Sequence, residues 1–138
     1  MIKNKFDIIL ADPPWKFSNK NTGGSMKSGA DFHYPTMTNK ELCQLPVKQI
    51  VSNQAVLFMW VPSALLYGTG KNPIHAYDIM KSWGFTYKTV VFDWLKVDSK
   101  GKPAFGMGFY SRSSIELCLL GVRGKPLERM NLSMLVTL

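Results

Sequence analysis

The sequence predicts an α/β fold with a single domain over residues 1–138. Short apolar runs recur at residues 6–11, 55–61 and 115–122, and such runs are typical of strands buried in a sheet. Segments with helix-capping residues or helical spacing lie between them. Because strands alternate with helices, we expect one sheet with helices on both faces.

A short buried strand is expected over residues 6–11. It ends at Pro13 and Pro14, because proline lacks the amide hydrogen that a sheet ladder needs. Residues 16–33 are rich in Lys, Asn, Ser and Gly, and we predict a loop there.

A helix is expected to begin at Thr38, which forms a capping box with Glu41 three residues later. It stops at Pro46, with a second turn towards Val51. Residues 55–61 form a nearly continuous apolar run, which predicts a central parallel strand buried on both faces.

The second half of the chain repeats this alternation. Residues 73–83 predict a helix that Gly84 closes. Its apolar positions follow a three-residue spacing: Ile74, Tyr77, Met80 and Trp83. Residues 86–97 are rich in β-branched and aromatic side chains and predict a strand. A loop rich in Gly and Lys follows over 98–113, and the last strand covers 115–122.

Composition indicates a globular protein with a polyanionic partner. The net charge is +8 and the pI about 9.6, and a basic protein gains affinity for nucleic acid by releasing condensed counterions. The lysines are dispersed, which weakens this indication. No apolar run is long enough for a membrane span and no secretory signal is visible, so we expect a cytoplasmic location in a bacterium or a phage-infected cell.

The sulfur and imidazole side chains do not predict a metal site. Cys43 and Cys118 are far apart in apolar contexts, which favours buried, reduced thiols. His33 and His75 have no Cys, His or carboxylate at ligand spacing, so we expect no zinc.

Asp12-Pro-Pro-Trp15 follows the first strand, at the carboxyl end where open α/β sheets bind ligands. A simple turn would explain Asp and Pro, but not two prolines followed by Trp.

The functional interpretation of the tetrapeptide is activation of an amine for methylation. The exocyclic amine of adenine is a poor nucleophile because its lone pair is delocalised. The Asp12 carboxylate and the Pro13 carbonyl can accept its two hydrogens from about 3 Å and localise that pair.

The other two residues of the tetrapeptide support this chemistry. Pro13 and Pro14 stiffen the turn, so that both acceptors are fixed before substrate arrives. Trp15 is predicted to offer a flat face on which an extruded base stacks, worth ~1–3 kcal/mol. No metal and no covalent intermediate is required.

The chain resembles the adenine amino-methyltransferases related to the catalytic subunit of the messenger-RNA adenosine methyltransferase. The resemblance covers residues 6–126 and rests on segments in the family's order: Ile9-Leu-Ala-Asp-Pro-Pro-Trp15, His33-Tyr-Pro-Thr-Met-Thr38, Leu57-Phe-Met-Trp-Val61, Trp83-Gly-Phe85, Trp94-Leu-Lys96, Gly106-Met-Gly-Phe-Tyr110 and Glu116-Leu-Cys-Leu-Leu-Gly-Val-Arg-Gly-Lys-Pro126. It implies a Rossmann-like methyltransferase fold and S-adenosylmethionine as the methyl donor.

The resemblance also implies roles for particular residues. The catalytic positions are Asp12, Pro13, Pro14 and Trp15. Three residues are expected to bind substrate: Tyr34, Lys96 and Arg112. Four are expected to line the cofactor pocket: Asp12, Ser113, Ser114 and Glu116.

Each of these assignments has an alternative. Tyr34 could have the purely structural role of anchoring its loop to the core. Lys96 and Arg112 could face the cofactor carboxylate or be solvated surface charges. Glu116 could pair with a neighbouring lysine. Gly106-Met-Gly108 opens no helix, so it predicts a flexible turn and not a cofactor loop.

The chain departs from the family pattern after Pro126, where the family's closing strands and adenosine-binding stretch would follow. We therefore expect a C-terminally truncated fold with an exposed apolar edge. A truncated or frame-shifted product, a designed fragment, or a chain completed by a partner polypeptide would each explain this. We expect the isolated chain to bind S-adenosylmethionine weakly or not at all.

The leading hypothesis is methyl transfer to adenine in DNA, which requires base flipping in a duplex and suits a restriction-modification setting. The alternatives are methylation of RNA adenine, an inactive fragment that binds nucleic acid or a partner subunit, and methylation of a protein amide. The last is disfavoured, because the related protein-directed motif usually begins with Asn and the chain is basic.

Overall fold

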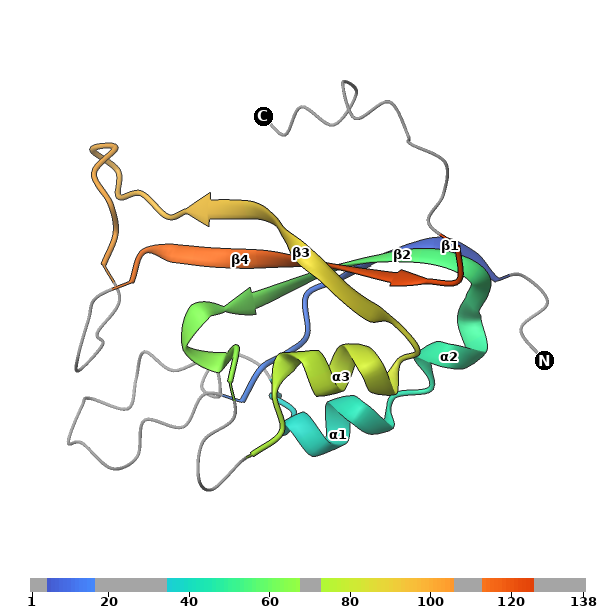
Figure 1. The fold of residues 1–138 in the computed structure, drawn as a ribbon. Helices are drawn as coiled ribbons and strands as arrows, with labels where there is room; N and C mark the ends of the chain where they lie inside the picture. Colours follow the sequence, from blue (N-terminus) through green and yellow to red (C-terminus); the bar gives the residue numbers. More distant parts are fainter. Residues whose placement is uncertain (1–4, 17–34, 68–72, 106–112, 126–138) are drawn as a thin grey trace.

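The computed structural model describes residues 5–16, 35–67, 73–105 and 113–125. Its strands form one mixed sheet: β1 (Phe6–Ala11), β2 (Val51–Pro62), β3 (Thr86–Leu95) and β4 (Ile115–Arg123). Their order is β1-β2-β4-β3 (Figure 1), with β1 parallel to β2 and β4 antiparallel to both of its neighbours. The predicted α/β class and the positions of the four predicted strands are confirmed. The prediction that β1 is a buried strand is wrong, because most of its residues are exposed. β2 is central as predicted, but it is parallel only to β1 and is fully buried on one face only.

The helices of the described part are α1 (Asn39–Gln44), α2 (Val47–Ile50), a 3₁₀ turn η3 (Ser63–Leu65) and α3 (Ala76–Ser82). The predicted capping box is confirmed, because the Glu41 amide donates to Thr38 Oγ1 at 3.3 Å and the Thr38 amide donates to Glu41 Oε2 at 2.7 Å. Pro46 separates α1 from α2. Gly84 follows α3 with φ +91°, a backbone conformation that glycine adopts without strain.

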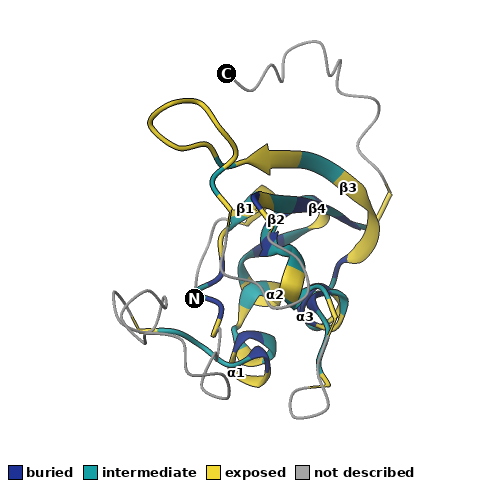
Figure 2. Cartoon of the chain, turned by 90° about the vertical axis from the view of Figure 1, so that its left-hand side faces the viewer, coloured by how far each residue is buried: buried dark blue, intermediate teal, exposed yellow. Residues whose placement is uncertain are grey.

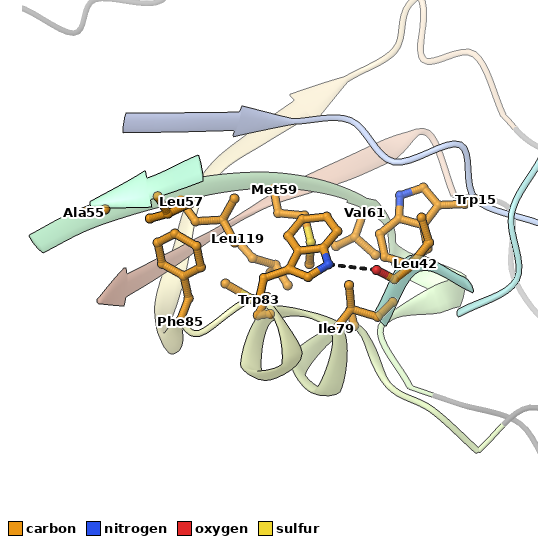
Figure 3. Packing of buried hydrophobic residues seen from close by; sticks show 13 residues of the cluster. Trp15, Leu42, Ala55, Leu57, Met59, Val61, Ile79, Trp83, Phe85 and Leu119 are labelled. Carbon is orange, nitrogen blue, oxygen red and sulfur yellow. Dashed lines mark hydrogen bonds between the residues drawn. The ribbon is translucent and has the colours of Figure 1, made fainter. Parts of the chain in front are cut away.

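The core lies between the sheet and the pair α1 and α3 (Figure 3). Burial alternates along β2, where Leu57, Met59 and Val61 are fully buried on the face towards these helices. The indole of Trp83 fastens the helices to each other, because its Nε1–H donates to the Leu42 carbonyl at 2.8 Å. A second link joins the buried Asn39 amide to the Ile74 carbonyl at 2.7 Å. These bonds satisfy polar groups that burial would otherwise penalise.

The described helices pack against one face of the sheet, whereas the sequence predicted helices on both faces (Figure 1). Residues on the other face, which we call the open face, include Leu10 with 72% of its surface exposed and Trp94 with 53%. The sequence could not separate the two faces, because residues 55–61 of β2 are apolar at every position. β3 is the edge strand next to β4 and is largely exposed (Figure 2).

Among the described segments, the helices are too short or too polar to cross a lipid bilayer.

Candidate active site

The tetrapeptide Asp12–Trp15 follows β1 directly, at the carboxyl end that the sequence predicted. Its turn is closed by the Trp15 amide, which donates to the Pro13 carbonyl at 2.8 Å. The Met37 amide donates to the Pro14 carbonyl at 2.8 Å, and the Lys16 amide donates to the Met37 carbonyl at 3.1 Å. The tetrapeptide is thus tied to the segment that leads into α1.

These bonds bear on the predicted acceptor role of Pro13. Its carbonyl oxygen has two lone pairs, and the Trp15 amide uses one of them. Among the described residues its second lone pair has no donor, although Pro13 as a residue is buried. The rings of Pro13 and Pro14 restrict their backbone φ angles, and the turn is hydrogen-bonded. The Pro13 carbonyl oxygen is therefore held rigidly.

Trp15 lies in the core, which corrects the prediction that a base stacks on it. Only 6% of its surface is exposed, and its Nε1–H donates to the Trp60 carbonyl at 3.0 Å. In Figure 3 its ring belongs to the same cluster as Leu42 and Val61. A base can stack only on an exposed ring face, so the described arrangement gives Trp15 the task of anchoring the tetrapeptide to β2.

Asp12 stands at the edge of this anchored turn and is exposed. Neighbouring atoms displace part of the water around its carboxyl group, and this desolvation raises the pKa of Asp12 above its ordinary value of 3.8. The negative charge of Glu116 raises it further, whereas the positive charge of Lys96 lowers it. The three side chains therefore interact electrostatically, although they come from distant parts of the sequence.

Lys96 and Glu116 form an ion pair between Lys96 Nζ and Glu116 Oε1. Lys96 follows β3, and its amide donates to the Ser114 carbonyl at 2.7 Å, next to the start of β4. The ammonium also lies over the Trp94 ring, 5.3 Å from the centroid. Of the alternatives left open by the sequence, the structure thus shows the pairing of Glu116 with a lysine.

The two serines assigned to a cofactor pocket lie at the same edge but differ in accessibility. Ser114 is buried, with 8% of its surface exposed. Ser113 is exposed, and its hydroxyl lies 3.3 Å from the Ser63 hydroxyl and accepts the Ile115 amide at 3.2 Å. Tyr34, Arg112 and the stretch 106–108 lie outside the described residues. The roles of these residues therefore stay predictions.

The cysteines are free, and neither lies in a disulfide. Burial raises the pKa of the Cys118 thiol to about 11, so that it stays protonated at neutral pH and is no nucleophile. Within the described ranges, no group of three His, Cys, Asp or Glu side chains is placed to hold a metal ion.

Sequence reasoning missed three parts of the site. Trp94 supports the Lys96 ammonium, and the carbonyl of Trp60 and the backbone of Met37 hold the tetrapeptide. The position of Trp94 two residues before Lys96, at a strand end, was a usable signal. The backbone contacts had none, because any residue type can make them.

The fold and this edge define an α/β protein with an Asp-Pro-Pro-Trp turn after its first strand. Comparison with known proteins identifies the group more narrowly. The profile of the MT-A70 family matches residues 6–136, and the chain belongs to this family.

Individual relatives agree with this assignment. The type II methyltransferase M.MunI of a Mycoplasma species is 34% identical over 137 residues, which cover 89% of this chain and 53% of that protein. The non-catalytic subunit MTB of an Arabidopsis thaliana N6-adenosine-methyltransferase is 30% identical, over 87% of this chain and 14% of that protein. The human N(6)-adenosine-methyltransferase catalytic subunit METTL3 is 24% identical, over 91% and 18%. The chain thus spans about half of the first relative's length and less than a fifth of the others'.

Proposed function

We propose that this chain carries the substrate-activating part of an S-adenosylmethionine-dependent methyltransferase that modifies the exocyclic amine of adenine in DNA. The observation that supports this most strongly is the rigid turn at the end of β1. It presents an exposed carboxylate at Asp12 and, at the buried Pro13, a fixed carbonyl whose second lone pair has no donor among the described residues. Both groups accept hydrogen bonds, as an amine with two hydrogens requires.

The activation is electronic and positional. Two acceptors draw the N–H bonds of the amine towards the protein, which turns the nitrogen lone pair out of the ring system. The acceptors are held before the substrate arrives, because Trp15 and Met37 fix the turn through the Trp60 carbonyl and the Pro14 carbonyl. Little reorganisation is then needed at the moment of reaction.

The charged edge fits the proposed cofactor. The amino acid end of S-adenosylmethionine is a zwitterion, and this edge offers the Lys96 ammonium as well as the carboxylates of Asp12 and Glu116. With 42% of its side chain exposed, Lys96 remains accessible although it is paired. The cofactor, when bound, supplies an electrophilic methyl group on a sulfonium.

The choice of DNA rests on the similarity to a type II methyltransferase at 34% identity. RNA is the second candidate, because other relatives are named adenosine methyltransferase subunits. One of those is a non-catalytic subunit, so a supporting role that binds nucleic acid or a partner chain also belongs to the possible functions of this family. The intact tetrapeptide with its exposed Asp12 favours catalysis.

The test measures methylated nucleosides after incubating the purified chain with isotopically labelled S-adenosylmethionine. Duplex DNA, single-stranded DNA and RNA are supplied in parallel, and N6-methyladenine is quantified by mass spectrometry. Because the isolated chain is expected to bind the cofactor weakly, the labelled cofactor is supplied in large excess. We then expect slow labelling of N6-methyladenine in DNA and a loss of at least ~100-fold in Asp12→Ala, the usual scale for a lost proton acceptor.

The matched control is Asp7→Asn, which removes an exposed carboxylate from β1 itself while leaving the turn intact. It should retain wild-type activity. Methylation confined to RNA would contradict the choice of substrate, and equal activity in Asp12→Ala would contradict the mechanism. A chain that binds both nucleic acid and the labelled cofactor but transfers no methyl group would support the non-catalytic alternative.

A further inference from the structure

The ion pair joins Glu116 of β4 to Lys96, which directly follows β3. Trp94 in β3 is paired in register with Glu116 in β4, so the two residues lie side by side at the strand ends. Lys96 follows two residues after Trp94, and its amide bond to the Ser114 carbonyl at 2.7 Å keeps the chain beside β4. β4 also pairs with β2, whose Pro62 is opposite Glu116. The pair therefore stands at the edge that carries the tetrapeptide.

The ammonium of Lys96 is held from two sides. The Glu116 carboxylate contacts it directly, with 22% of the Glu116 side chain exposed, and the Trp94 ring lies 5.3 Å away. Trp94 itself is supported by an edge-to-face contact with Trp60, at 6.3 Å between centroids. A lysine without such partners would sample many rotamers in water. In this structure the Glu116 carboxylate holds the Lys96 ammonium in one position.

The consequence concerns Asp12, which interacts with both charges. If Glu116 acted alone, Asp12 would stand beside a second carboxylate, and like charges at this edge would repel each other. An anchored ammonium offsets that repulsion. Its effect depends on distance, so it is reproducible only if Lys96 is kept in one position.

We propose that Glu116 is a positioning residue, whose carboxylate fixes the Lys96 ammonium beside Asp12 so that the substrate-facing carboxylate works next to an anchored cation. This deepens the proposed function and rests on it only for the role of Asp12. The positioning itself is a property of the folded chain and is measurable without methyl transfer.

The first measurement uses the Trp94 ring as a local probe. A side chain above an aromatic ring experiences an upfield ring-current shift, so the ε-methylene protons of Lys96 should resonate upfield in the wild-type spectrum. We expect Glu116→Gln, which keeps the size of the side chain but removes its charge, to lose most of this shift. Glu116→Asp, with the carboxylate one methylene shorter, should retain part of it.

The matched control is Asp93→Asn. Asp93 is the residue before Trp94 in β3, so it points to the opposite face of the sheet while carrying the same charge. Its removal should leave the Lys96 signal unchanged. An upfield shift that survives in Glu116→Gln would overturn the proposal, because the ring alone would then hold the lysine. If Glu116→Gln does not fold, as judged from its amide spectrum, Glu116→Asp decides the matter by the same signal.

The second measurement follows the carboxyl carbon of Asp12 through a pH titration in a double-mutant cycle. The cycle comprises wild type, Glu116→Gln, Lys96→Met and the double variant. We expect Lys96→Met to raise the pKa of Asp12, because the cation is lost while Glu116 stays. If Glu116 acts through Lys96, its replacement shifts this pKa differently in the presence and absence of the lysine. Equal shifts in both backgrounds would mean that Glu116 acts only by its own charge, and would refute the positioning role. Loss of methylation in the function test would leave both results intact.

Discussion

The two faces of the sheet carry similar apolar residues but differ in what covers them. On the helix face, Leu57 and Met59 are fully buried against α1 and α3. On the open face, Leu10 is 72% exposed and Trp94 is 53% exposed. Burial of apolar surface provides most of the folding free energy. The helix face therefore provides most of the buried core, whereas the open face buries only some of its residues, among them Cys118 and Val122.

The charged residues of the candidate site follow the same division. Trp94 and Glu116 are opposite each other on β3 and β4, at positions that alternate with the core-facing ones. The Lys96 ammonium lies over the Trp94 ring. The tetrapeptide joins the two sides, because Trp15 is buried in the core while Asp12 remains exposed. The helix face thus carries the stabilising core. The candidate site lies on the open face and at the end of the sheet that carries the tetrapeptide.

A pair of identical substitutions tests the comparison most strongly. Leu57→Ala should lower the free energy of unfolding by roughly 2–5 kcal/mol, because it leaves a cavity in the core. Leu10→Ala removes the same atoms from the neighbouring strand, but from an exposed position, and should change it by no more than about 0.5 kcal/mol. Urea denaturation followed by tryptophan fluorescence measures both. Similar losses in the two variants would mean that the open face is covered in solution.

Gly121→Ala tests how closely the helix face is packed. A Cβ atom at Gly121 would lie 2.6 Å from Met80 Cε and 3.1 Å from Phe85 Cβ. Met80 Cε is the end of a flexible side chain and can move, whereas Phe85 Cβ is close to the backbone. We expect a loss of roughly 1–3 kcal/mol, measured by the same denaturation. Met80→Leu in the same chain should recover part of the loss, and no loss at all would show that α3 is more loosely packed than described.

Much of this scaffold was predictable from the sequence, because the relevant signals are local. Thr38 and Glu41 predicted the start of α1, and Gly84 predicted the end of α3. The apolar run of β2 predicted a central strand, which the pairing with β1 and β4 confirms. Each of these signals depends on residues that are neighbours along the chain.

The misses have a different physical origin, since they depend on which segments meet in space. The antiparallel direction of β4 and the absence of a described helix on the open face could not be derived from apolar runs, which look alike for either direction or face. The tryptophan of the tetrapeptide was expected to be exposed, but the Trp60 carbonyl, 45 residues away, accepts its indole N–H. The pairing of Lys96 with Glu116 was left open for the same reason.

The smallest effect, and the one that separates scaffold from chemistry, is expected at Asp12. The folded state raises the pKa of this carboxyl, first through desolvation and then through Glu116, with Lys96 opposing both. A raised pKa means that the carboxylate form is less favourable in the folded than in the unfolded chain. Asp12 therefore destabilises the fold at neutral pH, and Asp12→Asn should unfold at a slightly higher temperature than wild type.

The pH dependence fixes the sign of this effect. Above the raised pKa, Asp12 is charged in both states and the destabilisation is complete. It decreases as the pH falls through that pKa, and it vanishes below the ordinary value of 3.8, where Asp12 is protonated in both states. The difference in Tm between Asp12→Asn and wild type should accordingly be positive at pH 7 and shrink towards zero on acidification. A lower Tm for Asp12→Asn at pH 7 would contradict this and mean that the Asp12 carboxylate stabilises the fold. The expected higher Tm means that the fold retains an unfavourable carboxylate at the edge where substrate would bind.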